Sequence, residues 1–172
     1  MQFKDVPEIQ TKRVTLRILN TKDVAIVFAL RSNEEVIQYI ARAPINFAEA
    51  EIKTQELVKY IDNNESISWI INLNDQAVQI GSICLWNFSA DRKTAEVGYD
   101  LLPEYHNKGF MNEALQRVVH FGLDTLKLEV IEAFTSKHNK GSIALLEKNS
   151  FKREEDRKDE GFPDNIIFSL IP

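Results

Sequence analysis

The sequence predicts an α/β fold in which a central, mostly antiparallel sheet contains one parallel pair of strands and is flanked by helices. Residues 68–102 hold three consecutive strand patterns separated by short polar turns, which is typical of an antiparallel meander. Residues 93–135 follow the order strand, helix, strand, and a unit of this length normally forms a right-handed parallel crossover. The 172 residues are enough to bury one core, so we expect a single domain over residues 1–172.

The first part of the chain predicts one strand followed by helices. Residues 14–19 (VTLRIL) alternate between apolar and polar side chains, as a half-buried strand does. Polar residues at 20–23 and at 33 are typical helix starts, and each is followed by apolar residues at helical spacing. A third helical pattern begins after Pro44 and ends near residues 62–64.

The rest of the chain alternates between strands and helices. Strands are predicted at 68–73 and 78–88, joined by a turn at 74–76, and a second polar turn at 89–92 leads into a strand at 93–102. A helix at about 110–124, a strand at 128–136, a helix at about 142–148 and strands near Phe151 and at 165–170 complete the prediction. The densely charged run 152–160 is expected to form a solvated loop between the last strands.

Composition narrows the classes of function. The chain has 21 Lys and Arg against 26 Asp and Glu, and this net charge of −5 does not favour nucleic acid as a partner. No apolar run approaches the ~18 residues of a membrane helix, and the first residues lack the apolar core of a signal peptide. With one cysteine, Cys84, we expect a cytoplasmic protein without an internal disulfide and without a membrane partner. The histidines and the cysteine lack metal-ligand spacing, so no metal is expected.

The loop before the helix at 110–124 is a candidate anion site. Ligands bind strand–helix–strand units where the first strand ends and the helix begins. The first N–H groups of a helix have no partner within the helix, and its dipole is positive at that end. Gly109 would let a phosphate approach the main chain closely, and Lys108 adds a positive charge. A simple surface helix start is the competing interpretation.

The segment EVGYDLLPEYHNKGFMNEAL, residues 96–115, closely resembles the acetyl-CoA-binding motif of the GNAT acetyltransferases, and it is most similar to the branch that includes RimJ and RimL. The family signature Q/R-x-x-G-x-G/A corresponds here to residues 106–111. TKRVTLRILNTKDVAIVFAL resembles the family's opening strand and helix, and SKHNKGSIALLEKNSF resembles its second conserved block. The resemblance therefore covers nearly the whole chain and implies a GNAT fold, with a twisted mixed sheet whose parallel strand pair lies at the cofactor site.

The resemblance also implies acetyl-CoA as cosubstrate and a set of residues that bind it. The main chain at the helix start would hold the diphosphate, with the contacts contributed by His106, Asn107, Lys108, Gly109, Phe110, Met111 and Asn112. A main-chain N–H near Leu101 would stabilise the oxyanion, and Asn139 would bind the pantetheine arm or the acceptor. His106 replaces the usual Gln or Arg, Met111 replaces Gly or Ala, and Ser150 replaces a glycine in the second block. These departures leave the main chain of the helix start in place.

Glu96 and Ser142 are the candidate catalytic residues. Glu96, Gly98 and Asp100 share one face of the strand 93–102, and a carboxylate in the middle of a strand is costly to bury unless it is paired or useful. Glu96 matches the family's general base, although an ion pair with Arg92, Lys93 or a neighbouring strand is an equal alternative. By resemblance Ser142 would lie near the sulfur as a proton donor. Asn139 is also a good N-cap for the following helix.

The resemblance leaves the acceptor open. A protein N-terminus, a polyamine, an amino acid or an aminoglycoside-like amine would each fit an N-acetyltransferase that works by direct attack in a ternary complex. The alternative is a GNAT-shaped protein that binds coenzyme A as a sensor or structural ligand and does not turn over. Dimers are common in this branch, so a homodimer is a further expectation.

Overall fold

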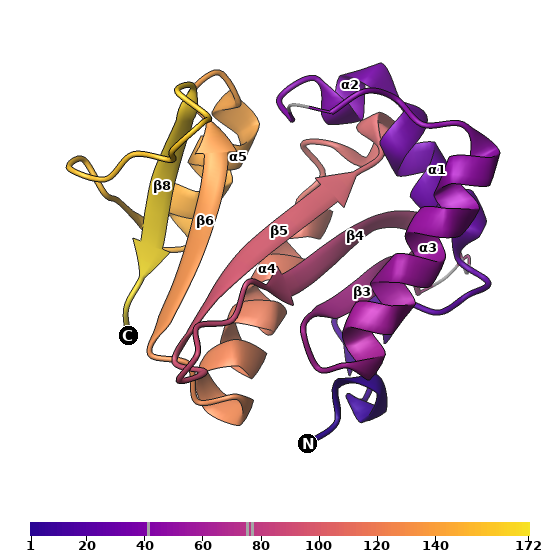
Figure 1. Ribbon diagram of the computed structural model, residues 1–172, viewed down its shortest axis with the longest axis horizontal. Coiled ribbons are helices and arrows are strands. Elements are labelled where there is room, and N and C mark those ends of the chain that lie inside the picture. The colour runs from indigo at the N-terminus through magenta and orange to yellow at the C-terminus, as the bar shows by residue number, and fades with distance from the viewer. Residues whose placement is uncertain (41, 75, 77) are drawn as a thin grey trace.

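A single eight-stranded sheet forms the centre of the computed structural model, which describes residues 1–40, 42–74, 76 and 78–172 (Figure 1). The strands are β1 (Ile9–Gln10), β2 (Val14–Ile18), β3 (Ile67–Leu73), β4 (Gln79–Trp86), β5 (Thr94–Leu101), β6 (Val130–Ser136), β7 (Lys152–Arg153) and β8 (Asn165–Leu170). Their spatial order is β1-β2-β3-β4-β5-β6-β8-β7. In the described chain all neighbours are antiparallel except β5 and β6, which are parallel. The predicted mixed sheet with one parallel pair is confirmed.

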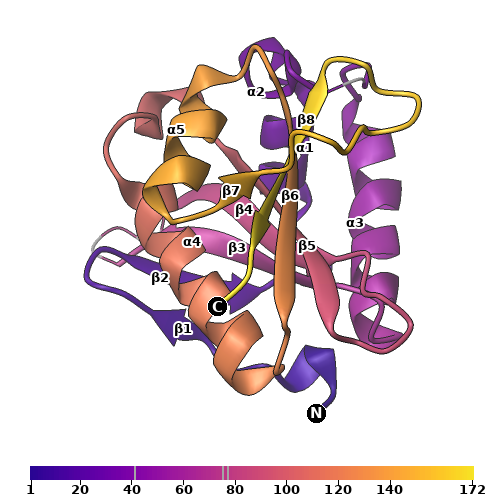
Figure 2. The same cartoon turned by 90° about the vertical axis from the view of Figure 1, so that its left-hand side faces the viewer.

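Helices cover both faces of the sheet (Figure 2). The helices are α1 (Val24–Ser32), α2 (Glu34–Ile37), α3 (Phe47–Asp62), α4 (Phe110–His120) and α5 (Lys140–Lys148). A π-helical turn at Phe121–Thr125 extends α4, and 3-10 turns lie at Phe3–Asp5 and Pro103–Tyr105. The helices α1–α3 lie on one face, and α4 and α5 lie on the other.

The predicted element boundaries hold with small differences. The helix that begins after Asn33 is shorter than its apolar spacing suggests, since it ends at Ile37, where the side chain of the C-cap residue Gln38 donates to the Glu35 carbonyl. The strand predicted at 78–88 spans 79–86. The turn predicted at 74–76 includes Asp75, which lies outside the described residues.

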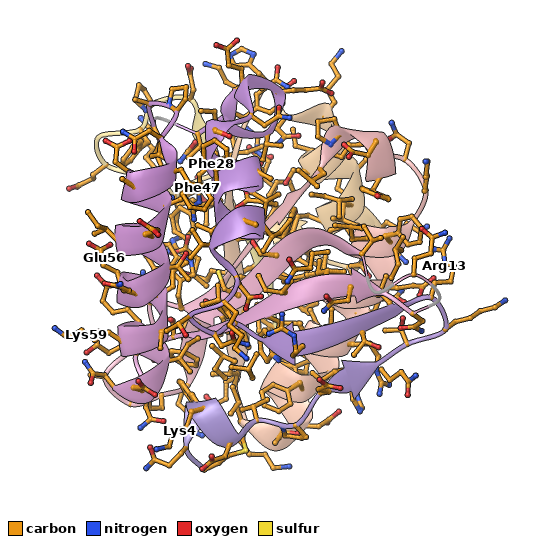
Figure 3. All side chains as sticks on the ribbon, turned by 90° about the vertical axis from the view of Figure 1, so that its right-hand side faces the viewer. Lys4, Arg13, Phe28, Phe47, Glu56 and Lys59 are labelled. Carbon is orange, nitrogen blue, oxygen red and sulfur yellow. The ribbon has the colours of Figure 1, made fainter. Side chains whose placement is uncertain are left out.

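The core lies on both sides of the sheet. The predicted apolar face of α4 is buried, with Ala114, Leu115 and Val118 fully inaccessible to solvent. On the other face, α1 packs against α3 through an edge-on contact of Phe28 with Phe47, whose ring centroids are 5.5 Å apart (Figure 3). The resulting two-sided packing fixes the position of β5, which carries Glu96 and Leu101 and leads toward the loop before α4.

The start of α1 is fastened to the sheet by a buried ion pair. The Asp23 side chain is 3% exposed and accepts two bonds from the Arg17 guanidinium of β2, at 2.7 and 3.1 Å. It also accepts bonds from the Asn20 N–H and from the Gln79 amide of β4. A carboxylate this buried is stable only because every one of these donors is present.

We therefore predict that Asp23→Ala lowers the free energy of unfolding by about 3 kcal/mol, because it leaves the Arg17 charge and two other donors without their partner. Denaturant titration followed by circular dichroism measures this change. Lys93→Ala is the control, since Lys93 and Glu129 form an exposed pair that solvent screens, and its loss should leave the free energy of unfolding nearly unchanged. Equal losses in the two variants would contradict the structural role of Asp23.

Candidate active site

The strands β5 and β6 pair over only part of their length and then diverge (Figure 1). The paired residues are Thr94 with Val130, Ala95 with Ile131 and Glu96 with Glu132. The N–H of Leu102 donates to the Ile80 carbonyl on the β4 side. Hydrogen-bonding direction alternates along an antiparallel strand, so the N–H groups of Tyr99 and Leu101 point away from β4 and into the opening. Two main-chain donors therefore face the space between the diverging strands.

The start of α4 presents a second group of free donors. Gly109 is the N-cap residue with a left-handed φ of 81°, and within the described residues no side chain caps the helix. Among the described residues, the N–H groups of Phe110, Met111 and Asn112 have no hydrogen-bond partner, while Glu113 N–H bonds the Gly109 carbonyl. Asn107 also has a positive φ of 58°. The loop therefore directs unpaired main-chain donors at one point, as an anion-binding site requires.

Arg13, in the turn between β1 and β2, braces this loop. Its Nη1 donates to the Lys108 carbonyl at 2.9 Å, and its Nε pairs with the Glu113 carboxylate. The guanidinium carbon lies 4.6 Å from the centre of the Phe110 ring. A Cβ added to Gly109 would lie 3.1 Å from Arg13 Nη2, so the guanidinium also covers the glycine. The sequence analysis missed this residue, because nothing in the strand pattern shows a contact 95 residues away.

The side chains of the other predicted loop residues stabilise the loop and leave its main chain available. His106 Nε2 donates to the Leu101 carbonyl at 2.8 Å, so this histidine orients the end of β5. Lys108 Nζ lies 5.8 Å from the centre of the Tyr105 ring. Met111 is buried in the core. The side chain of Asn112 accepts a bond from Asn149 at the end of α5.

Glu96 lines a large open cleft of about 1660 Å³ on the α1–α3 face of the sheet. The carboxylate is half-buried and accepts a bond from the Asn87 amide at 3.3 Å. Burial raises the pKa of Glu96 to about 7, and the Asn87 bond opposes this rise. The sequence left open an ion pair with Arg92 or Lys93, but Lys93 pairs with Glu129 and Arg92 bonds the Asn64 carbonyl. Glu96 is therefore a carboxyl group poised to titrate near neutral pH.

Ser142 and Asn139 line the same cleft as Glu96. Asn139 caps α5, as predicted, because its Oδ1 accepts a bond from the Ser142 N–H at 3.0 Å. The Ser142 hydroxyl is 2.8 Å from the hydroxyl of Tyr99, a residue that the sequence analysis did not single out. Burial raises the pKa of Tyr99 to about 12, and the bond to Ser142 opposes this. The two hydroxyls form one hydrogen-bonded pair at the opening between β5 and β6.

The fold brings the predicted residues into two groups joined by β5. Glu96, Asn139 and Ser142 line the cleft, and residues 106–112 form the helix start beyond the end of β5. Leu101 lies between the groups, with its N–H in the opening and its carbonyl bonded to His106. Cys84 also lines the cleft, but burial raises the pKa of its thiol to about 12, which makes it a poor nucleophile at neutral pH.

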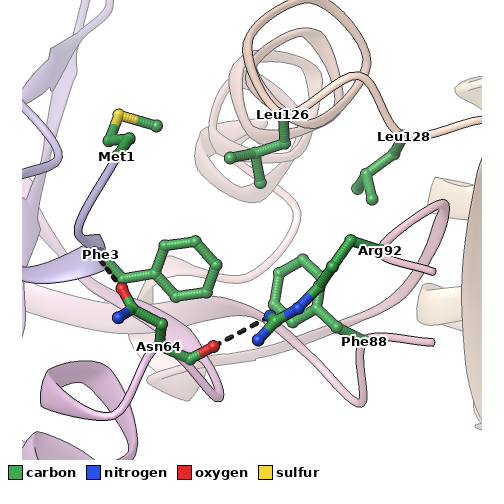
Figure 4. Close-up of a pocket in the computed structure, with 7 residues that line it drawn as sticks. All are labelled: Met1, Phe3, Asn64, Phe88, Arg92, Leu126 and Leu128. Carbon is green, nitrogen blue, oxygen red and sulfur yellow. Dashed lines mark hydrogen bonds between the residues drawn. The ribbon is translucent and has the colours of Figure 1, made fainter. Parts of the chain in front are cut away.

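A second, smaller cavity of about 250 Å³ contains none of the predicted site residues (Figure 4). It lies beside the N-terminus and is lined by Met1, Phe3, Asn64, Phe88, Arg92, Leu126 and Leu128. The Arg92 guanidinium lies 5.1 Å from the centre of the Phe88 ring and donates to the Asn64 carbonyl at 2.9 Å. Asn64 also accepts a bond from the Phe3 N–H, so these contacts tie the N-terminus to the end of α3.

Comparisons with known proteins agree with this arrangement. A family model described as "Acetyltransferase (GNAT) domain" matches residues 13–152. The uncharacterized N-acetyltransferase YoaA of Bacillus subtilis is 31% identical over 149 residues, which cover 86% of this chain and 84% of YoaA. The ribosomal-protein-S5-alanine acetyltransferase of Vibrio fischeri has a TM-score of 0.83 at 19% identity, covering 96% of this chain and 97% of that one. RimL, the ribosomal L7/L12 α-N-protein acetyltransferase solved with coenzyme A, has a TM-score of 0.82 at 17% identity, covering 96% and 98%.

The chain therefore belongs to the GNAT acetyltransferase family. The two solved structures share its fold, including the RimL-type arrangement expected from the sequence. Family membership makes it an acetyl-CoA-dependent acyltransferase. Within the described ranges, no helix has the length and apolar character needed to cross a membrane.

The contacts of Arg13 with the loop before α4 lead to a prediction. Arg13→Ala should raise the Kd for coenzyme A roughly tenfold, because the loop loses its contacts to β1–β2 and must be ordered by the ligand. Isothermal titration calorimetry measures the Kd. Lys12→Ala removes a neighbouring positive charge without these contacts and should leave the Kd within twofold. A tenfold higher Kd for coenzyme A in both variants would show that net charge, and not the contacts of Arg13 with the loop, governs the affinity.

Proposed function

We propose that this protein transfers the acetyl group of acetyl-CoA directly to a primary amine, with Glu96 as the general base. One observation carries the proposal: a half-buried carboxylate, with no ion pair among the described residues, lines the same cleft as Ser142 at the point where β5 and β6 diverge. An ammonium cannot attack a thioester, so a base must first remove its proton. A carboxyl group with a pKa of about 7 can do so at neutral pH.

The free main-chain donors fit the parts of acetyl-CoA. The N–H groups at the start of α4 suit a diphosphate, since they are unpaired and lie at the positive end of the helix. The opening between β5 and β6 offers donors to an extended pantetheine arm, as an added strand would require. Leu101 N–H is our candidate for the oxyanion donor. Asn139 lies close enough to line the path of the arm.

The proposed reaction replaces the C–S bond of the acetyl group by a C–N bond and releases one proton net, because the nitrogen loses two protons and the sulfur takes up one. Glu96 accepts a proton from the ammonium, and the amine nitrogen then attacks the acetyl carbonyl carbon. The tetrahedral intermediate collapses as the C–S bond breaks and its electron pair passes to sulfur. Coenzyme A leaves as a thiolate that takes up one proton, and the acetylated nitrogen loses its remaining extra proton to solvent.

The Ser142–Tyr99 pair is the proposed donor to the departing sulfur. A serine hydroxyl alone is a poor acid, but the Tyr99 hydroxyl at 2.8 Å can donate to Ser142 Oγ while Ser142 donates onward. The pair would then stabilise the thiolate by a hydrogen bond and relay its proton. Because both hydroxyls act through one chain, neither contributes independently.

Thiol release separates the proposed enzyme from a protein that only binds coenzyme A. Mixing the protein with acetyl-CoA and a panel of N-terminal peptides and small amines should release free coenzyme A in step with acetylated amine. A sensor would bind acetyl-CoA in calorimetry and release none. We further propose that residues 1–172 act as one domain and that the protein works in the cytoplasm.

The assignment of Glu96 predicts a distinct pH profile. Below about pH 7 the carboxyl group is mostly protonated and cannot accept the ammonium proton, so kcat should rise with pH through about 7 and then level off. Glu96→Gln should lower kcat about 100-fold and abolish the rise of kcat with pH. Stopped-flow or steady-state rates at saturating amine measure both effects.

Glu132→Gln is the matched control for this experiment, because Glu132 is the neighbouring carboxylate on β6 and pairs with Arg157. The Glu132→Gln variant should keep the rise of kcat with pH, with its midpoint at slightly lower pH, since the negative charge of Glu132 helps raise the pKa of Glu96. If Glu96→Gln retains the rise of kcat with pH and more than a third of the wild-type kcat, the base is another group.

The hydroxyl pair makes a separate prediction about additivity. Tyr99→Phe and Ser142→Ala should each lower kcat roughly tenfold, and the double variant should be no slower than the worse single variant. A double-mutant cycle on kcat at saturating substrates tests this. If the fold-decrease in kcat of the double variant equals the product of the two single decreases, the two hydroxyls act separately.

A further inference from the structure

Acidic and basic side chains both line the large cleft. Glu96 and Asp100 lie on its floor, on the same face of β5 and two residues to either side of Gly98. On the side of the helices the lining includes Arg31 from α1, Lys53 from α3, Arg42 in the loop before α3 and Glu65 after it. The other titratable residues of the lining include Arg92, His138, Asp159 and Asp164. A ligand with one positive and one negative group could pair with Asp100 and Arg31 at the same time.

Gly98 leaves a shallow seat between the two carboxylates. A Cβ added at Gly98 would lie 3.3 Å from Cys84 Sγ and 3.7 Å from Trp86 Nε1, so a side chain here would crowd Cys84 and cover the strand between the two carboxylates. Glu96 and Asp100 are each about 7 Å along the strand from Gly98. An ammonium above Gly98 would therefore have a carboxylate on each side.

Arg31 faces this seat from the helical wall without a partner of its own. In the described part of the chain its side chain forms no hydrogen bond or ion pair, and Asp100 also has no side-chain hydrogen bond. Burial raises the pKa of Asp100, and the positive charge of Arg31 partly offsets this rise. Lys53, in contrast, pairs with Glu56. The two charges are thus close enough to affect each other but remain unpaired.

We propose that the cleft selects a primary amine that also carries an acidic group. This inference rests on the proposed acetyl transfer and adds the substrate class. The ammonium lies over Gly98 between Glu96 and Asp100, and the acidic group pairs with Arg31, whose planar guanidinium suits a carboxylate or phosphate oxygen pair. A polyamine or aminoglycoside would instead place a second positive charge beside Arg31.

Three amines of similar chain length test the proposal. 4-Aminobutyrate, butylamine and 1,4-diaminobutane carry a negative, a neutral and a positive group at the far end. The expected order of kcat/KM is 4-aminobutyrate, then butylamine, then 1,4-diaminobutane, with roughly a tenfold difference between the first and the second. A higher kcat/KM for 1,4-diaminobutane than for 4-aminobutyrate would overturn the proposal.

Substitutions at Arg31 identify the source of the preference. Arg31→Gln should bring 4-aminobutyrate and butylamine within about twofold of each other, and Arg31→Glu should place 1,4-diaminobutane first. Lys22→Gln is the matched control, because it removes one exposed positive charge just before α1, outside the cleft lining, and should keep the wild-type order. An unchanged order in Arg31→Glu would refute the role of Arg31.

Binding of the three amines to the coenzyme A complex, measured by calorimetry, separates this inference from the proposed function. The same order of affinity without any thiol release would support the acidic-amine site and refute the acetyl transfer. Thiol release with equal affinity for all three amines would support the transfer and refute the site.

Discussion

The incomplete pairing of β5 with β6 is the constraint on which the site depends. A parallel pair normally continues along both strands, but here it stops after Glu96 and Glu132. In the part of the chain that the structure describes, the divergence leaves the N–H groups of Tyr99 and Leu101 without a strand partner, and it opens the sheet between its two faces. In the proposed reaction, a substrate arm that enters from the α4 side meets a second substrate on the α1–α3 side, beside Glu96. Glu96 is the last paired residue of β5 and lines the cleft.

The fold holds these unpaired donors in place through contacts that come from distant parts of the chain. Arg13 fastens the loop before α4 to the β1–β2 turn, and Asn149 fastens Asn112 to the end of α5. His106 bonds the last carbonyl of β5. Since these side chains already order the main chain, a bound diphosphate would not have to. Preorganised N–H groups stabilise developing charge more strongly than flexible ones.

Sequence patterns predicted most of the fold and part of the site. The apolar patterns located β2–β6 and α1, α3, α4 and α5, because most of these elements bury one apolar face and β3 is buried on both. The segment 96–115 led to the α4 loop and to Glu96, since the relevant residues are neighbours in the chain. The sequence could not reveal Arg13 over Gly109, the Tyr99–Ser142 bond or the unpaired Arg31, because these depend on contacts between residues far apart in the chain. The sequence also could not show whether Glu96 forms an ion pair or titrates near neutral pH. The answer depends on Lys93 and Arg92, which bind Glu129 and the Asn64 carbonyl instead.

Amide chemical shifts offer the most direct test of the central claim that free main-chain donors hold the cofactor. Coenzyme A added to ¹⁵N-labelled protein should shift the amide resonances of Tyr99, Leu101 and residues 110–112 more than any others. The amides of Trp69 and Ile70, in the middle of β3, serve as internal references and should stay in place. Binding that leaves the 110–112 amides unshifted would contradict the account, because the diphosphate would then lie elsewhere.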